Sequence, residues 1–500
     1  MSSAPRPVEA RTPEPTPSDN PRRWLGLVFI GLAQLMIVLD ITVVNIALPS
    51  AQQDLGISAG DRQWVITAYT LAFGSLLLLG GRIADYTGRK RAFLIGLIGF
   101  ACASALGGAA TGFTLLLAAR ALQGAFAALL APAALSLLSV SFTESRERAK
   151  AFGVYGAIAA GGSAIGLLLG GLLTEYLDWR WCLYVNVPIA VIAACGWSVL
   201  PTDRRATART RLDLPGALLA TSGLVAVVYG CSKAESDGWD SPLVMALLTS
   251  GVCLLVGFVL FEARSPRPLL PLRVVTDRTR ASAYLAVALA VIGMFGMFLF
   301  LTYYMQVVKD YSAVVTGVAF LPLTAGVLVS AGGIASRLLP RVPPRALVVP
   351  GLLLAAVGTG WLIPLEADTS YATGVLPAEI IVGLGMGLVM APAMNYATHG
   401  VRPEDSGVAS AMANTSQQIG ASIGTALLNT IAIEASSDYL AGRRHTPDVL
   451  RDALVEGFST AYSVATVILV AAALVIAVLM NAPRPATVGE AGREPAPHMG

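Results

Sequence analysis

The sequence has 500 residues, of which 55% are hydrophobic and only 13% are charged, with a net charge of +3. The charged share is about half that of soluble domains, and so little polar surface cannot cover a water-soluble protein of this length. A lipid bilayer removes the difficulty because apolar side chains can face lipid, and the 50 glycines suit close helix packing there. The composition therefore excludes a soluble enzyme and indicates a membrane protein.

Apolar stretches long enough to cross a membrane recur along the chain. A helix needs about 20 mostly apolar residues to do so. Fourteen such stretches are predicted, at residues 24–48, 63–81, 92–110, 113–139, 152–174, 181–200, 214–232, 242–261, 281–304, 314–335, 346–363, 373–397, 407–433 and 456–480. The polar, proline-rich segment 1–23 and the segment 481–500 are predicted to be disordered tails. The first span is too long for a signal peptide, so we expect it to remain in the mature protein.

The basic residues predict which side of the membrane each loop faces. If the N-terminus is cytoplasmic and the spans alternate, 26 of the 34 lysines and arginines lie on the cytoplasmic side. Seven lie outside, and Arg120 alone lies within a span. Because cytoplasmic loops are enriched in lysine and arginine, both termini are expected in the cytoplasm.

Short matches between the two parts of the chain indicate an internal repeat. The motif that contains Gly166 and Gly170 recurs 254 residues later, and the Ala-Pro-Ala sequence at 131–133 recurs at 391–393. An offset of eight helices predicts an all-α fold of two six-helix bundles of equal orientation. The bundles are expected at 24–200 and 263–480, with two additional helices in 201–262. Substrate would bind near the midplane between the bundles, and rocking of the bundles would give alternating access.

Two charged residues within the predicted spans are functional candidates. Asp40 and Arg120 come about nine and eight residues from the outer ends of the first and fourth spans. At 1.5 Å per residue, both lie roughly 12–14 Å below the outer face, a depth that allows an ion pair or a water-bridged contact. Asp40 is the candidate proton carrier, and a permanent structural pair is the alternative. Asn45 offers its amide either to the transport cavity or to a neighbouring helix.

The segment between the second and third spans, residues 81–91, reads GRIADYTGRKR. Gly81 and Gly88 permit a tight turn, and Asp85 can cap a helix or pair with an arginine such as Arg89. Two interpretations stay open, a gating loop and a hairpin that only obeys the positive-inside rule.

Four glycines of the fifth span share closely spaced positions, Gly162, Gly166, Gly170 and Gly171. Small residues four apart let two helix backbones approach closely. The glycine face can serve antiport or ordinary helix packing.

Glu379 is a third charged candidate. The Ala-Pro-Ala match places it within one residue of the position equivalent to Arg120, at similar depth in the other bundle. It is a candidate second proton site or an attraction for a cationic substrate, and snorkelling from a helix end is the alternative.

Several of these segments resemble the major facilitator superfamily. Residues 81–91 are similar to its signature loop, G-x-L-a-D-r-x-G-r-k, with departures at Ile83 and Tyr86. Residues 39–49, LDITVVNIALP, resemble the first-helix motif of the fourteen-helix drug:proton antiporters of the EmrB/QacA type. Residues 179–188 resemble the start of the sixth helix in that family, and the likeness covers about residues 24–480.

The resemblance implies roles for some residues. Arg120 and the Gln-Gly pair that follows it resemble the fourth-helix motif R-x-x-Q-G, which implies that Arg120 couples protonation to conformational change. The glycine face is similar to the antiporter motif G-P-x-x-G-G, but Leu167 replaces the proline, so the kink that a proline would supply is absent.

Other function classes find little support in the sequence. None of the four lysines follows a glycine, so a Walker A loop for ATP is absent. The three histidines, His399, His445 and His498, are scattered and suggest no metal site. We therefore expect no enzyme, no cofactor and no nucleic-acid partner.

The predicted function is proton-coupled efflux of hydrophobic or cationic drug-like compounds across the cytoplasmic membrane, with protons, the small-molecule substrate and the bilayer as partners. One alternative is a dedicated exporter of a single natural product or siderophore. A membrane sensor that binds ligand without moving it is a further alternative, although the predicted interior loops are too short for a large partner-binding segment.

Overall fold

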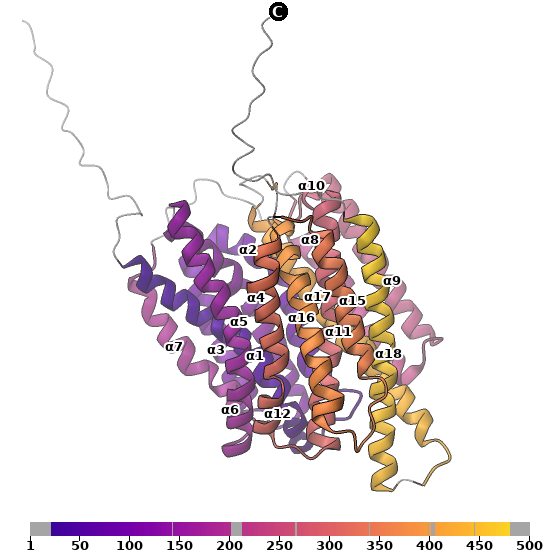
Figure 1. Ribbon diagram of the computed structural model, residues 1–500. Coiled ribbons are helices and arrows are strands. Elements are labelled where there is room, and N and C mark those ends of the chain that lie inside the picture. Colours follow the sequence, from indigo (N-terminus) through magenta and orange to yellow (C-terminus); the bar gives the residue numbers. More distant parts are fainter. Residues whose placement is uncertain are drawn as a thin grey trace, which may run out of the picture.

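The computed structural model is a bundle of helices, with no strand among the residues it describes (Figure 1). These residues are 22–142, 144–201, 213–265, 268–339, 341–398, 400–401, 406–444 and 446–480. Apart from Arg22 and Arg23, the two predicted tails lie outside them. Helices suit a bilayer because every backbone N–H and C=O group there must find its partner within the protein.

The first group of helices runs from indigo to magenta in Figure 1. It comprises α1 (Arg23–Leu55), α2 (Trp64–Thr87), α3 (Arg89–Gly108), α4 (Phe113–Ser141), α5 (Ser145–Tyr176) and a sixth segment divided into α6 (Trp181–Tyr184), α7 (Asn186–Ala194) and η2 (Cys195–Ser198). α4 packs against α2 and α3, and α1 packs against α5. We call these helices the N-terminal group.

Two further helices follow, α8 (Leu214–Asp237) and α9 (Pro242–Arg264). Asp213 caps α8, since its carboxylate accepts from the Gly216 N–H at 3.0 Å. α8 packs against α2, α17 and α9, whereas only 11% of the apolar window of α9 is buried. α9 therefore presents most of its surface to lipid.

The last group, which we call the C-terminal group, runs to yellow in Figure 1. It comprises α10 (Leu272–Val275), α11 (Arg278–Tyr303), η3 (Tyr304–Val308), α12 (Ala313–Ala319), α13 (Leu321–Leu328), η4 (Val329–Ala335), α14 (Ser336–Leu338), α15 (Arg345–Trp361), η5 (Tyr371–Val375), α16 (Leu376–Ala397), α17 (Ser406–Leu440) and α18 (Pro447–Leu479). The segments η3, η4 and η5 are π-helical. α16 packs on α15 and α13, and α11 packs on α17 and α18.

Twelve helical segments of the described chain are long and apolar enough to cross a membrane. The two other predicted spans correspond to α5 and to α15, which is apolar but only 17 residues long. The all-helical architecture is as predicted, and the count of fourteen stays a prediction.

The internal repeat is visible as the same helix crossing in both groups. A Cβ added to Gly170 on α5 would lie 3.0 Å from the Val43 Cα on α1. A Cβ added to Gly424 on α17, the matching glycine, would lie 2.6 Å from the Ile292 Cα on α11. In both groups a glycine thus lets two helix backbones touch.

The first residues of α1 and the last of α18 lie at the same end of the bundle, the upper end in Figure 1. We call this the inner end and the opposite one the outer end, in keeping with the predicted orientation.

Candidate functional site

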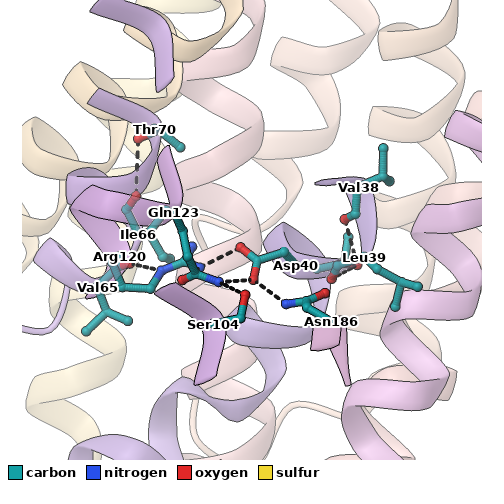
Figure 2. Close-up of polar contacts among 11 residues, drawn as sticks. Val38, Leu39, Asp40, Val65, Ile66, Thr70, Ser104, Arg120, Gln123 and Asn186 are labelled. Carbon is teal, nitrogen blue, oxygen red and sulfur yellow. Dashed lines mark hydrogen bonds and ion pairs between the residues drawn. The ribbon is translucent and has the colours of Figure 1, made fainter. Parts of the chain in front are cut away.

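Asp40 lies fully buried in α1, where three side chains donate hydrogen bonds to its carboxylate (Figure 2). Arg120 NH1 donates to Oδ2 at 2.5 Å, and the amides of Gln123 and Asn186 each donate to Oδ1 at 2.9 Å. Arg120 and Gln123 are neighbours on α4, and Asn186 begins α7. The predicted equal depth of Asp40 and Arg120 is therefore realised as a direct ion pair.

Further contacts hold Arg120 in place. Its Nε donates to the Val65 carbonyl at 2.9 Å, its NH1 also reaches Gln123 Oε1 at 2.9 Å, and its guanidinium lies 4.5 Å from the centre of the Tyr69 ring. The Gln123 amide donates in turn to Ser104 on α3 at 2.7 Å (Figure 2). The ion pair is thus one part of a network that joins α1, α2, α3, α4 and α7.

Sequence reasoning assigned no role to Asn186, Ser104 or Tyr69. All three are buried polar residues within apolar spans, and this is a weak signal because hydroxyls and amides are common at helix contacts in membranes. Only the packing of α2, α3 and α7 against α1 and α4 brings them to the ion pair.

Asn45 lies one turn further toward the outer end of α1 and contacts the C-terminal group. Its Nδ2 donates to Thr302 Oγ1 at 3.1 Å and to the Phe298 carbonyl at 3.4 Å, both on α11. The structure therefore places Asn45 at a contact between helices, the second of its two predicted interpretations.

Arg62, in the connection between α1 and α2, is the centre of a polar contact between the groups near the outer end. Its Nε donates to Asn429 Oδ1 at 3.0 Å, and its guanidinium lies 4.1 Å from the centre of the Tyr303 ring. Asn429 donates to Gln63 at 2.8 Å, and the Tyr303 hydroxyl donates to Gln52 at 2.5 Å. We call these five residues the outer latch.

The glycine face of α5 divides between two partners. Three of its members face α1, namely Gly162, Gly166 and Gly170. Gly171 instead faces α12, where an added Cβ would lie 2.7 Å from the Ala313 carbonyl oxygen, and Gly317 on α12 faces the carbonyl of Leu167. Near the outer end, α5 and α12 thus cross with their backbones in contact.

The predicted loop at 81–91 is mostly helical, so its predicted extent was wrong. Gly81 lies inside α2, Arg89 begins α3, and only Gly88 separates the two helices. Gly88 has φ of 97°, a conformation that glycine adopts readily. The basic, polar residues extend the helices beyond the apolar spans, which hydropathy cannot detect. The side chain of Asp85 lies outside the described residues.

Arg82, from the same segment, reaches the chain that leads into the C-terminal group. Its NH2 donates to the Pro268 carbonyl at 2.7 Å. Toward the middle of the membrane, Thr415 Oγ1 on α17 donates to the Gly74 carbonyl on α2 at 3.2 Å. The other hydrogen bonds between the groups described above lie nearer the outer end, so this conformation is closed on the outer side.

Glu379, in the first turn of α16, is fully buried and does not reach the surface by snorkelling. The Tyr371 hydroxyl lies 3.2 Å from its Oε2. No arginine or lysine of the described chain forms an ion pair with it. The structure therefore keeps Glu379 apart from Asp40 and Arg120, in the other helix group.

Comparisons with known proteins agree with this architecture. Residues 30–425 match the model of the Major Facilitator Superfamily. The sequence is 56% identical to the puromycin resistance protein pur8 of Streptomyces alboniger over 92% of each chain. It is 40% identical to the cephamycin export protein CmcT of Amycolatopsis lactamdurans, over 82% of this chain and 85% of that protein.

A solved structure shares the fold at lower identity. The bacterial homolog of the human lysosomal transporter Spinster, in an inward-facing and unoccupied conformation, is 18% identical, with a TM-score of 0.66 over 92% of this chain and 98% of that one. The chain therefore belongs to the major facilitator superfamily, as a multi-pass membrane transporter whose relatives include antibiotic resistance and export proteins.

Proposed function

We propose that this transporter exports an antibiotic across the cytoplasmic membrane in exchange for protons, by alternating access. The observation that carries the proposal is the buried ion pair of Asp40 and Arg120, 2.5 Å apart within the spans of α1 and α4. A proton bound by Asp40 would remove the negative charge and leave Arg120 buried without its counter-charge. Such a state is costly, so proton binding favours a rearrangement of the surrounding helices.

The relatives support a choice of substrate. The puromycin resistance protein and the cephamycin export protein are each named for one antibiotic. We therefore take puromycin as the first compound to test, and these names favour a dedicated exporter. The multidrug range that the sequence first suggested would appear as additional efflux of unrelated cationic dyes.

The fourteen-helix subtype belongs to the same proposal. If α5 and α15 cross the membrane together with the twelve apolar segments, the chain has fourteen spans and both termini in the cytoplasm, as in the EmrB/QacA type. The six-helix bundles 24–200 and 263–480, with α8 and α9 between them, follow from that count. Reporter fusions at successive loops would test it, because each segment that crosses the membrane moves the next loop to the opposite side.

The contacts between the groups suggest how the two sides alternate. The outer latch must separate for release to the outside, and the contact of Arg82 with the Pro268 carbonyl is placed to control the inner side. In this scheme the segment from Gly81 to Arg91 is the inner gate, and the glycine face of α5 lets α1 and α12 move past it.

Export can be tested in a bacterium that lacks its own efflux pumps. We expect the wild-type protein to lower puromycin accumulation, and a protonophore to abolish this effect. Asp40→Asn should remain in the membrane but lose proton-dependent efflux. Full protonophore-sensitive export by Asp40→Asn would refute the role of Asp40, and accumulation that the wild type leaves unchanged would refute puromycin as substrate.

A further inference from the structure

Glu379 is a second buried carboxyl group, separate from the Asp40 network. It follows the π-helical turn η5 and is completely buried. Its Oε2 contacts only the Tyr371 hydroxyl, and its Oε1 has no hydrogen-bond partner among the described residues. A buried carboxyl group therefore lacks most of the hydrogen bonds that an ionised form would need.

The hydrogen atoms at Tyr371 indicate which form of Glu379 fits this site. The Tyr371 hydroxyl has a single hydrogen and lies 2.7 Å from the carbonyl oxygen of Ala319, which can only accept. If that shorter bond uses the hydrogen, the 3.2 Å contact with Glu379 needs a hydrogen from the carboxyl group itself. The geometry therefore fits a protonated Glu379 that donates to the Tyr371 oxygen.

The other groups around Glu379 supply no positive charge. Tyr462 on α18 is buried, and its hydroxyl has no hydrogen-bond partner in the described chain. α13 and α15 meet α16 largely through glycines, such as Gly326 and Gly358. Since no arginine or lysine of the described residues forms an ion pair with Glu379, a proton is the ligand that would neutralise this carboxyl group.

An acidic cavity lies at the outer end of the C-terminal group. This open cavity of about 590 Å³ is lined by five carboxylates and one arginine, namely Glu366, Asp368, Asp448, Asp452, Glu456 and Arg451. The Tyr304 hydroxyl donates to the Glu366 carbonyl at 2.8 Å. The carboxylates attract protons to this part of the outer end.

Two of the tyrosines named above lie at irregular helical turns. Tyr304 begins the π-helical turn η3, and Tyr371 begins η5. π-Helical turns are rare and occur often at functional sites. Here they orient two phenol groups in the outer half of the C-terminal group.

We propose that Glu379 is a second proton-binding site, which takes a proton from the outer side and holds it as a neutral carboxylic acid in this outer-closed conformation. A proton from external water joins the carboxylate oxygen to form the acid, and the acid gives the proton up when the inner side opens. This inference rests on the proton-coupled export proposed above and assigns part of the coupling to the C-terminal group.

The first test needs no transport. Infrared spectra of the purified full-length protein in lipid report the C=O band of a protonated carboxyl group. We expect this band at neutral pH and expect Glu379→Gln to remove it, whereas Glu434→Gln, a change at an exposed glutamate of α17, should retain it. A Glu379→Gln spectrum with the wild-type band intact would overturn the proposal.

Tyr371→Phe provides a second variant if Glu379→Gln does not accumulate. It removes the oxygen that accepts from the acid, so the band should shift and not disappear. A band at the wild-type position in Tyr371→Phe would contradict the assignment to Glu379.

The second test measures protons released per puromycin transported in proteoliposomes. Glu379→Gln should release fewer protons than the wild type, and equal release would overturn the coupling role of Glu379. If the wild type moves puromycin without protons, the proposed antiport fails, and the infrared band still decides whether Glu379 binds a proton.

Discussion

The two helix groups share a scaffold but differ in the charges they bury. The α5–α1 and α17–α11 crossings both depend on glycines at matching positions, Gly170 and Gly424. The N-terminal group, however, holds the complete Asp40–Arg120 pair, and the C-terminal group holds Glu379 with a single phenol contact. The repeat has therefore preserved packing while the polar chemistry of the halves has diverged.

The two carboxyl groups therefore have different environments. Asp40 accepts three hydrogen bonds, one from an arginine, so its ionised form is well stabilised. Glu379 has neither the cation nor the donors. Protonation thus breaks an existing network in one half and completes an incomplete one in the other.

The largest effect is expected when the N-terminal network loses its cation. Arg120→Met would leave Asp40 buried without a counter-charge, which costs about 3–5 kcal/mol. We expect a markedly lower unfolding temperature and loss of puromycin export. Thermal unfolding of the purified protein and accumulation assays would measure the two effects.

A double variant separates stability from coupling. Asp40→Asn combined with Arg120→Met leaves no buried charge, so most of the thermal stability should return while proton-driven export stays absent. A double variant as unstable as Arg120→Met would show that packing around Arg120, and not the unpaired charge, dominates the loss.

A second prediction concerns the matching glycines at the two helix crossings, α5–α1 and α17–α11. Gly170→Leu and Gly424→Leu each force a large side chain against a backbone that a Cβ already contacts at 3.0 Å or less. Overpacking costs about 1–3 kcal/mol, and the repeat predicts similar losses of thermal stability for both. Gly161→Ala is the control, because nothing lies within 4 Å of a Cβ there. A large loss at only one of the two glycines would contradict equivalent crossings.

The sequence predicted where a residue lies along its own helix better than which residues of other helices it contacts. The rise per residue predicted the equal depths of Asp40 and Arg120. The partner Asn186 could not be predicted, because sequence does not tell which helices are neighbours. The same limit hid Tyr371, whose approach to Glu379 depends on a π-helical turn that no sequence signal marked.

The helix ends were harder to predict than the helix centres. Hydropathy ended the second span near residue 81, yet α2 continues to Thr87 because a helix does not stop where the hydrocarbon does. The resemblance marked 81–91 as a functional segment, but only the structure shows Arg82 at the Pro268 carbonyl.

Substitution of Asn186 makes a smaller change to the Asp40–Arg120 network of the N-terminal group. Asn186→Ala removes one of the three donors to Asp40 and leaves the ion pair intact, a loss of about 1.5–3 kcal/mol for a bond to a charged group. We expect lower thermal stability, with export reduced but still sensitive to a protonophore. Loss of export as complete as in Arg120→Met would mean that Asn186 acts directly in transport.

The smallest effect is expected where the two groups meet. Asn429→Ala removes the bonds of the outer latch to Arg62 and Gln63 while each group keeps its own buried carboxyl site. A loss of about 1.4 kcal/mol would shift the balance toward the outward-open conformation about tenfold, so thiol labelling of a cysteine placed at Thr302 should become faster from outside. Asn414→Ala, on the same helix, is the control because, among the described residues, its amide donates to the Ser410 carbonyl of α17 alone. Equal labelling rates in the two variants would show that the latch does not hold the outer side closed.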